Sequence, residues 1–292
     1  MSINIKEKTY DVDSPLYESW LLLKKNKTAM VGLGILAILI LVAIFAKIIA
    51  PFDPNIQDIG IRLTRPFTNG HLFGTDDFGR DIFSRIIYGS RISLMIGIIS
   101  VAISFVIGTI IGLVAGFWGG WIDNLLMRLM DIMLAFPYIL LAIVIVAMLG
   151  PSLQNSMIAI GVVGIPQYAR IVRSSVLAEK ESDYILAERS LGESNLKLLF
   201  FSILPNCLSP IIVNTTLGFG NAILEAAGLS FLGLGAQPPL PEWGLMLNSA
   251  RAFVSSAWWV VTFPGLAILF AVIGFNLLGD GLRDVLDPRL KN

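Results

Sequence analysis

One stretch of the sequence indicates how the chain is organised. It is Leu177-Ala-Glu-Lys-Glu-Ser-Asp-Tyr-Ile-Leu-Ala-Glu-Arg-Ser-Leu-Gly-Glu-Ser-Asn-Leu-Lys-Leu-Leu-Phe-Phe-Ser-Ile-Leu-Pro205. It is the longest charge-rich interval between two very apolar regions, since the runs 132–169 and 198–224 hold no charged residue. Charged side chains are costly inside a bilayer. The stretch therefore predicts an aqueous loop between membrane-spanning segments.

The middle of this stretch predicts a short helix with defined ends. Asp183 is a suitable N-cap, because a short carboxylate accepts hydrogen bonds from the first free amides of a helix. Gly192 suits the C′ position, because glycine tolerates the left-handed conformation found there. The helix between them would have about two and a half turns.

One face of this helix is apolar. Tyr184, Ala187 and Leu191 recur at positions i, i+3 and i+7, while Glu188 and Arg189 lie beside them. A helix this short is not stable alone and cannot bury an apolar stripe by itself. We therefore expect the stripe to bind a partner surface.

The same stretch resembles the cytoplasmic coupling loop of ABC importer permeases. The family pattern is Glu-Ala-Ala, three residues, Gly, nine residues, Ile, one residue and Leu-Pro. Four positions agree with it, namely Ala187, Gly192, Leu204 and Pro205. The resemblance implies contact with cytoplasmic ATPases through Asp183, Tyr184, Ala187, Glu188, Arg189, Gly192, Leu204 and Pro205.

The chain departs from this pattern at three positions. Leu186 stands where the family has its Glu, Glu188 where it has the second Ala, and Ser202 where it has Ile. If Asp183 caps the helix, position 186 is N3, where a Glu would close a capping box. Leu186 cannot form that hydrogen bond.

The composition indicates a membrane protein. Of 292 residues, 55% are hydrophobic and 14% are charged, and the mean hydropathy is +0.77, which is far too apolar for an ordinary soluble domain. The formal net charge is zero, so nothing points to nucleic acid. With Cys207 as the only cysteine and His71 as the only histidine, the sequence provides no internal disulfide, thiolate cluster or His-paired zinc site.

The apolar runs predict an all-α polytopic membrane protein with six transmembrane helices. The first run, 29–49, is too long for the h-region of a signal peptide, so we expect it to persist as a transmembrane helix. The lysine-bearing residues 15–27 before it suit an amphipathic helix at the membrane surface. The expected organisation is a cytoplasmic N-terminal tail (1–28), a first transmembrane helix (29–50), an extracytoplasmic segment (51–91), a core of five transmembrane helices that includes the loop at 177–205 (92–279) and a cytoplasmic C-terminal tail (280–292).

The distribution of basic residues sets the expected orientation. With six spans, both termini and the loop at 177–205 share one side of the membrane. About two thirds of the 21 lysine and arginine residues fall on that side. The positive-inside rule therefore places the termini and this loop in the cytoplasm.

Charged residues and glycines subdivide the core. Three charged residues mark a short return loop after the second span, and the uncharged run 132–169 is long enough for two spans divided at 150–156. Those loop residues are Asp123, Arg128 and Asp131. Four glycines recur every fourth residue, which predicts close helix packing more than a pore face. They are Gly108, Gly112, Gly116 and Gly120.

The extracytoplasmic segment contains a cluster of acids and arginines in the run Phe73-Gly-Thr-Asp-Asp-Phe-Gly-Arg-Asp81. Neighbouring carboxylates allow a catalytic or metal site. The spacing of Asp77, Asp81 and Arg85 instead fits ion pairs along a helix, which we favour. The run resembles the Gly-Thr-Asp-x-x-Gly-Arg-Asp signature of the peptide and nickel branch of these permeases, carried here by Gly74, Thr75, Asp76, Gly79, Arg80 and Asp81. The resemblance assigns it no catalytic role.

Polar residues interrupt the fifth apolar segment. Asn214, Asn221 and Glu225 are candidates to line a translocation path, because polar groups at membrane depth are costly unless they face a cavity or a partner. For Glu225, a bond to a neighbouring helix or a place near the outer interface is an equal alternative. The tryptophans Trp243, Trp258 and Trp259 suit interfacial positions.

The stretches 224–247 and 278–291 resemble the same branch, so the resemblance extends from residue 29 to the end of the sequence. It implies the type I ABC importer permease fold and the role of a C-type permease subunit for dipeptides or oligopeptides in a bacterial cell membrane. Nickel or a metal chelate is the alternative substrate. Such a subunit is expected to pair with a second homologous permease, two cytoplasmic ABC ATPases and an extracytoplasmic substrate-binding protein.

The sequence carries no Gly-x-x-x-x-Gly-Lys-Ser/Thr phosphate loop, so energy must come from another chain. We expect no enzymatic activity, no metal and no cofactor in this chain, with ATP and Mg²⁺ bound by the ATPases. An intramembrane hydrolase using Asp76, or Asp123 with Asp131, lacks a Ser/His or His-x-x-x-His set. A membrane scaffold without transport does not explain the charged stretch at 177–205.

Overall fold

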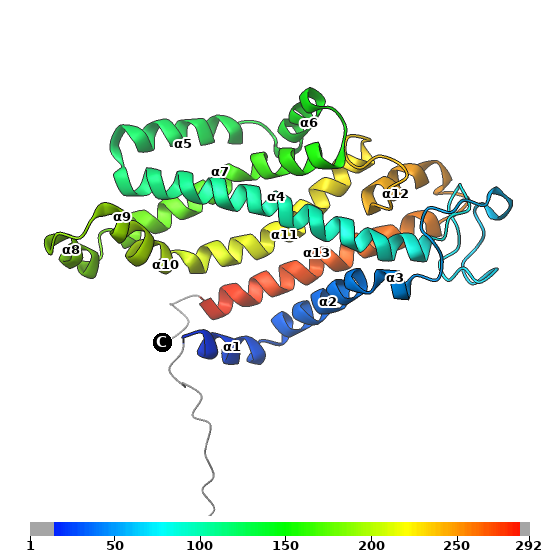
Figure 1. Ribbon diagram of the computed structural model, residues 1–292, viewed down its shortest axis with the longest axis horizontal. Helices are drawn as coiled ribbons and strands as arrows, with labels where there is room; N and C mark the ends of the chain where they lie inside the picture. Colours follow the sequence, from blue (N-terminus) through cyan, green and yellow to red (C-terminus); the bar gives the residue numbers. More distant parts are fainter. Residues whose placement is uncertain (1–14, 287–292) are drawn as a thin grey trace, which may run out of the picture.

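The structure, a computed structural model, describes residues 15–286 as an elongated bundle of helices (Figure 1). The parts of the expected tails at 1–14 and 287–292 lie outside the described residues. No β-strand occurs within residues 15–286. The elements in chain order are α1 (Pro15–Lys25), α2 (Lys27–Ile44), α3 (Ala46–Ile49), η1 (Ile59–Ile61), α4 (Ile82–Trp118), α5 (Gly120–Leu134), α6 (Tyr138–Leu149), α7 (Leu153–Glu179), α8 (Asp183–Ser190), α9 (Asn195–Lys197), the π-helical η2 (Leu198–Ile203), α10 (Leu204–Asn206), α11 (Leu208–Phe231), α12 (Trp243–Ala250), η3 (Arg251–Phe253) and α13 (Trp259–Leu286).

Up to five segments of the described chain are long and apolar enough to cross a membrane, and α7 is a sixth helix of sufficient length. Helices α2, α4 and α13 are each long and apolar enough to cross a membrane. Two more segments are bent pairs, α5 with α6 at 92° and the helical run 195–206 with α11 at 60°. The sixth, α7, has 27 residues and is therefore about 40 Å long at 1.5 Å per residue.

The third segment differs from the expected one. Asp123 and Asp131 lie within helix α5 and not in a return loop. Both carboxylates pair with arginines of α7, Asp123 with Arg173 and Asp131 with Arg170, each at 2.5 Å. These ion pairs let the helix continue through its charged residues. Helix α6 has only 12 residues, about 18 Å, and is too short to cross a ~30 Å hydrocarbon core alone.

Glycines bring α4 and α7 into close contact, as their spacing predicted. A Cβ atom at Gly108, Gly112 or Gly116 would lie within 2.8 Å of an atom of α7. Gly120 does not share this contact, because it begins α5 and a Cβ there would meet nothing within 4 Å. Three of the four glycines therefore form the packing face.

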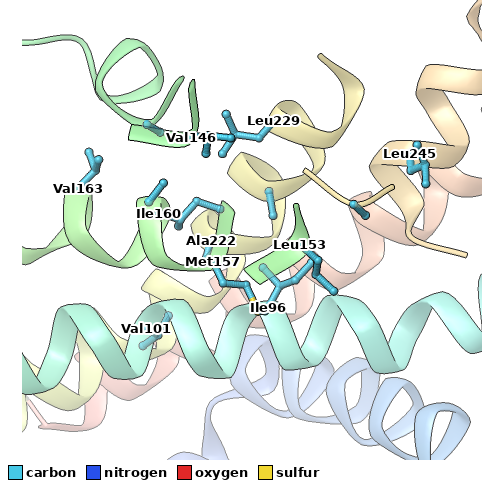
Figure 2. Close-up of a cluster of buried hydrophobic side chains, with 14 of the residues drawn as sticks. Ile96, Val101, Val146, Leu153, Met157, Ile160, Val163, Ala222, Leu229 and Leu245 are labelled. Atoms are coloured by element: carbon cyan, nitrogen blue, oxygen red, sulfur yellow. The ribbon is translucent and has the colours of Figure 1, made fainter. Parts of the chain in front are cut away.

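Buried apolar side chains join α4, α6, α7 and α11 into a core (Figure 2). Ile96 of α4, Val146 of α6, Ile160 of α7 and Leu229 of α11 are each at most 2% exposed. A second buried cluster joins α11, α12 and α13 with the start of α4. The bundle is thus held by contacts between helices that are far apart in sequence.

Two tryptophans expected at the membrane interface are buried. Trp243 donates its indole N–H to the Ile86 carbonyl at 3.1 Å, and Trp259 donates to the Thr75 carbonyl at 3.3 Å. Both side chains belong to the second cluster, because these distant carbonyls satisfy their polar atoms. Trp258 is exposed.

The two ends of the described chain lie side by side. Asn26 caps α2 through the Ala29 amide at 3.1 Å and donates to Asp284 of α13, also at 3.1 Å. Helix α13 runs on to Leu286, so the expected tail from residue 280 begins as helix. In Figure 1 the start of α2 and the end of α13 lie toward the same end of the bundle as α8.

Candidate functional site

Helix α8 forms where the sequence predicted it, with one correction at its start. Ser182, not Asp183, is the N-cap residue, because Ser182 has the extended backbone (ψ 147°) and Asp183 is already helical. Leu186 is therefore at N4, where no capping-box Glu is needed. Gly192 follows the C-cap with φ +86°, the left-handed conformation expected at C′.

One side chain anchors α8 to the bundle. Ile185 is fully buried in a cluster with apolar residues of α4, α7, η2 and α11. The guanidinium of Arg189 also lies 5.9 Å from the centre of the Phe117 ring of α4, within range of a cation–π contact. The helix is thus fixed to the ends of the long helices and is not a free loop.

The predicted apolar stripe is exposed, although the Tyr184 hydroxyl reaches back to the bundle. Tyr184, Ala187 and Leu191 are all exposed, and Leu191 is 86% exposed. Exposed apolar side chains grouped on one face mark an interaction surface. The stripe is therefore open to a partner, and its binding to one stays a prediction.

Hydrogen bonds tie α8 to the segment that leads into α11. Ser202 of η2 donates to the Glu188 carboxylate at 2.6 Å. Asn206 of α10 donates to the Tyr184 hydroxyl at 2.9 Å and to the Ser202 carbonyl at 2.7 Å. Tyr184 in turn donates to the carboxylate of Glu179 at the end of α7.

This network has two consequences. Partial burial and the hydrogen bond to the Glu179 carboxylate raise the pKa of Tyr184 to about 12, so the hydroxyl stays a donor at neutral pH. Glu188 and Ser202, two positions where the sequence departs from the coupling-loop pattern, are hydrogen-bonded to each other. Sequence reasoning missed this pair, because the two residues lie 14 positions apart on different elements.

Leu204 and Pro205 lie just before a bend. Leu204 is half-buried and packs against the cluster that holds Ile185, whereas Pro205 is exposed near the start of α10. The chain bends by 60° between the run 195–206 and α11. These two residues therefore lie between α8 and the helix that carries the candidate path residues.

The signature at 74–81 lies at the opposite end of the bundle from α8 (Figure 1). Gly74 and Gly79 have positive φ, and a Cβ at Gly79 would lie 1.8 Å from the Asp58 carbonyl oxygen. Thr75 donates to the Ile61 carbonyl at 2.5 Å. Because Gly74 and Gly79 have no side chain, two segments of the loop can approach each other closely.

The acids of this signature stabilise the loop. Asp76 accepts from the backbone amide of Arg80 at 2.9 Å and from its Nε at 2.7 Å. Asp81 caps α4 through the Ser84 amide at 2.7 Å and contacts His71 Nδ1 at 2.9 Å. The expected i, i+4 pairing of Asp77, Asp81 and Arg85 is wrong, because the helix begins only at Ile82.

The candidate path residues border two cavities. Asn221 and Glu225 line a cavity of about 90 Å³ between α4, α6, α7 and α11. Asn214 lines a larger cavity of about 530 Å³ between α7, α11 and α13. Gln167 lies between the cavities, where its amide donates to Asn214 at 3.1 Å. No local pattern in the sequence singled out Gln167 or Tyr168 of α7 as part of this polar group.

These features define a multi-pass α-helical membrane protein with internal polar cavities and an exposed, firmly held helix at one end. Residues 108–292 match the family described as binding-protein-dependent transport system inner membrane component. Residues 14–66 match the N-terminal transmembrane domain of oligopeptide transport permease C. The chain belongs to the family of binding-protein-dependent transport inner-membrane components, which are transport subunits and not enzymes.

Relatives match along nearly the full chain. The dipeptide transport system permease protein DppC of Alkalihalophilus pseudofirmus is 54% identical over 98% of this chain and 94% of its own length. DppC of Escherichia coli K12 is 52% identical over 95% of this chain and 94% of its own length. The glutathione transport system permease protein GsiD of E. coli is 47% identical over 96% of this chain and 92% of its own length.

Solved structures support the fold. A chain of the MetNI methionine ABC transporter, in an inward-facing conformation, aligns with a TM-score of 0.58 at 19% identity. The alignment covers 70% of this chain and 98% of the other. The protein thus has the type I ABC permease fold that the sequence predicted.

Proposed function

We propose that this chain is a permease subunit of an ATP-driven importer of short peptides in the bacterial cell membrane. The relatives above are named for dipeptides and for glutathione, itself a tripeptide. These names favour a peptide substrate over nickel or a metal chelate. The substrate would cross a path formed by this chain and a second homologous permease.

The observation that carries the proposal is the construction of α8. Its apolar stripe is exposed, while Ile185 and the Glu188–Ser202 hydrogen bond fix it to the bundle. A surface that is both unpartnered and rigid suits transmission of motion from another chain. We assign contact with the ATPases to Asp183, Tyr184, Ala187, Glu188, Arg189 and Gly192, and place Leu204 and Pro205 where motion passes to α11.

The energy source lies on partner subunits. The chain has no phosphate loop, so two cytoplasmic ABC ATPases would bind ATP and Mg²⁺. Closure of the ATPases would move α8, and the permeases would alternate between outward and inward access around the path. ATP shifts the population because it binds the two states with different affinity. A substrate-binding protein would deliver the peptide from outside.

The orientation follows from charge and from the arrangement of the ends. The basic residues favour the side that holds the termini, and the start of α2 and the end of α13 lie toward the α8 end of the bundle (Figure 1). We therefore place 1–28, 177–205 and 280–292 in the cytoplasm and 51–91 outside.

Cysteine labelling tests this orientation. Cys207 is buried and is the only cysteine, so a Cys207→Ser background gives a clean start. Phe67→Cys and Leu191→Cys place single thiols at positions that are 82% and 86% exposed. A membrane-impermeant maleimide added to intact cells should label position 67 and spare position 191. The reverse pattern would overturn the orientation.

Affinity purification tests the function. The full chain with a C-terminal tag, extracted in mild detergent, should bring down a homologous permease and two ATPases that carry phosphate loops. Ala187→Glu puts a charge on the exposed stripe, so it should release the ATPases and retain the permease. Recovery of the chain alone in a monodisperse form would contradict the proposal.

A further inference from the structure

A small polar cavity lies inside this subunit at membrane depth. It has a volume of about 90 Å³ and is enclosed by α4, α6, α7 and α11. Its polar lining comes from all four helices, namely Ser100, Ser104, Tyr138, Gln167, Tyr168, Asn221 and Glu225. Polar groups are rare in spanning helices and are kept where they face a partner or a path.

Glu225 is the one charged side chain in the lining of this cavity. It is half-buried, and it takes part in none of the ion pairs formed among residues 15–286. Its neighbour in the cavity wall is Tyr138, whose hydroxyl donates to the Ile160 carbonyl at 3.1 Å and also lies within hydrogen-bonding reach of the Glu225 carboxylate. A carboxylate in this setting is stabilised when a cation approaches it.

One buried group in the wall of this cavity lacks a partner. The Tyr168 hydroxyl forms no hydrogen bond within the described chain, although Tyr168 is only 4% exposed. Such unsatisfied buried groups are uncommon in folded proteins and require an explanation. A free hydroxyl is a donor that suits a carbonyl oxygen.

The size and opening of the cavity limit what it holds. Water takes up about 30 Å³ per molecule in the liquid, so 90 Å³ accommodates a few waters or one end of a peptide, but not a whole dipeptide. Asn221 is exposed, which places the mouth of the cavity on the surface of α11. The occupant would therefore reach in from the path beside α11.

We propose that this cavity is a subsite for the α-ammonium end of the transported peptide, with Glu225 as its anionic partner. The Tyr168 hydroxyl donates to the first carbonyl group of the peptide. The subsite rests on the proposed peptide import and adds a recognition step inside the membrane. The Gln167–Asn214 hydrogen bond separates the subsite from the larger cavity, so its opening releases the peptide toward the α8 end.

Two variants probe the subsite by different routes. Glu225→Gln keeps the shape and removes the charge. Gly218→Val fills the cavity, because a Cβ at Gly218 would lie 3.0 Å from the Tyr168 hydroxyl. Gly34→Val is the matched control, because a Cβ at Gly34 would meet nothing within 4 Å.

The experiment uses the complete transporter in proteoliposomes with its binding protein and radiolabelled glycyl-alanine. Both cavity variants should lower the rate of peptide uptake at least about tenfold, as expected for the loss of a charged hydrogen-bonding partner. ATP hydrolysis stimulated by the loaded binding protein should persist, and Gly34→Val should transport normally. Thermal unfolding of Glu225→Gln should match that of the parent protein.

Three other results would contradict either the subsite or the proposed function. Normal uptake by Glu225→Gln would overturn the subsite. A parallel loss of uptake, stimulated ATP hydrolysis and thermal stability in Glu225→Gln would also overturn it, because Glu225 would then be a structural residue. If the parent transporter takes up no peptide at all in the presence of ATP, the proposed function itself fails, which is a distinct result.

Discussion

The two ends of the bundle are built in opposite ways. In the loop at 51–81, the charged residues of the signature at 74–81 are partly or fully buried, and Arg80 and Asp81 are only 5% and 2% exposed. Hydrogen bonds from within the chain satisfy the Asp76 and Asp81 carboxylates. At the α8 end the charged side chains are mostly exposed and apolar ones face outward, with Leu191 at 86% exposure.

This difference separates two kinds of rigidity. The loop end is closed by its own contacts, so a change there should act on stability. The α8 end is fixed to the bundle on one side and open on the other, so a change there should act on partner binding and coupling. Variants at each end can break or sharpen this distinction.

The largest effect is expected in the closed loop. Gly79→Val should lower the free energy of unfolding by about 3 kcal/mol or more, because it combines left-handed strain with a backbone clash. Its φ is +72°, and a Cβ would lie 1.8 Å from the Asp58 carbonyl oxygen. Thermal unfolding in detergent and the yield of inserted protein measure the loss.

Gly119→Val is the matched control for this variant. Gly119 also has positive φ, +64°, but a Cβ there would meet nothing within 4 Å. With ψ −156°, it should cost only the strain of a backbone region that glycine alone readily adopts, about 1–3 kcal/mol. An equal loss in both variants would show that the loop backbone is not tightly held.

The next effect concerns coupling at the open end. Gly192 has φ +86° and open space around its Cβ position, so Gly192→Val should shift the end of α8 at a cost of about 1–2 kcal/mol. Peptide uptake should fall at least about tenfold while ATP hydrolysis continues. The reason is that a displaced α8 would no longer transmit the movement of the ATPases to α11. Gly150→Val, with φ +94° and open space, is the control away from α8. Normal uptake by Gly192→Val would refute the coupling role.

A smaller effect distinguishes the faces of α8. Leu191 lies on the predicted stripe, while Leu186, which is 42% exposed, lies off it. Leu191→Ala should weaken binding of the purified ATPases about tenfold, as for a buried interface anchor, and Leu186→Ala should weaken it less. Neither should change thermal unfolding, since both side chains are exposed. The opposite order of affinities would place the other face of α8 on the ATPase.

Local patterns predicted much of this molecule. The six segments, α8, its glycine end and the glycine face of α4 follow from hydropathy and spacing over a few turns. The start of α8 was wrong by one residue, because Ser182 and Asp183 are both good capping residues and the backbone angle decides between them. Such short-range choices are settled by small energies.

Pairings across the fold were not predictable from one sequence. Asp123 marks a helix and not a loop, because its partner Arg173 comes from α7, 50 residues away. Trp259 is buried through a carbonyl 184 residues away. The polar cavity draws on four helices, so no local pattern announces it. The spacing of apolar residues predicts which face of a helix is apolar. Which other helix packs against that face depends on the tertiary structure.

The smallest expected effect concerns Glu188 and Ser202, two residues that depart from the coupling-loop pattern and are hydrogen-bonded to each other at the α8 end of the bundle. The Ser202–Glu188 hydrogen bond is short, at 2.6 Å, and charge-assisted. Glu188→Ala alone should cost about 1 kcal/mol of unfolding free energy, and Ser202→Ile alone should cost as much by leaving a half-buried carboxylate without its donor. The double variant restores the residue types of the coupling-loop pattern at both positions. Its loss should be smaller than the sum of the single losses by about 1 kcal/mol.

The measurement is a double-mutant cycle on the parent protein, the two single variants and the double variant. For each protein, both the unfolding midpoint and the peptide uptake per ATP hydrolysed are measured. Recovery of both quantities in the double variant would show that the hydrogen bond replaces an apolar contact as the connection between α8 and η2. Strictly additive losses would mean that the two residues act independently. The rigidity of α8 would then rest on Ile185, on the hydrogen bonds of Tyr184 with Glu179 and Asn206, and on the Arg189–Phe117 contact.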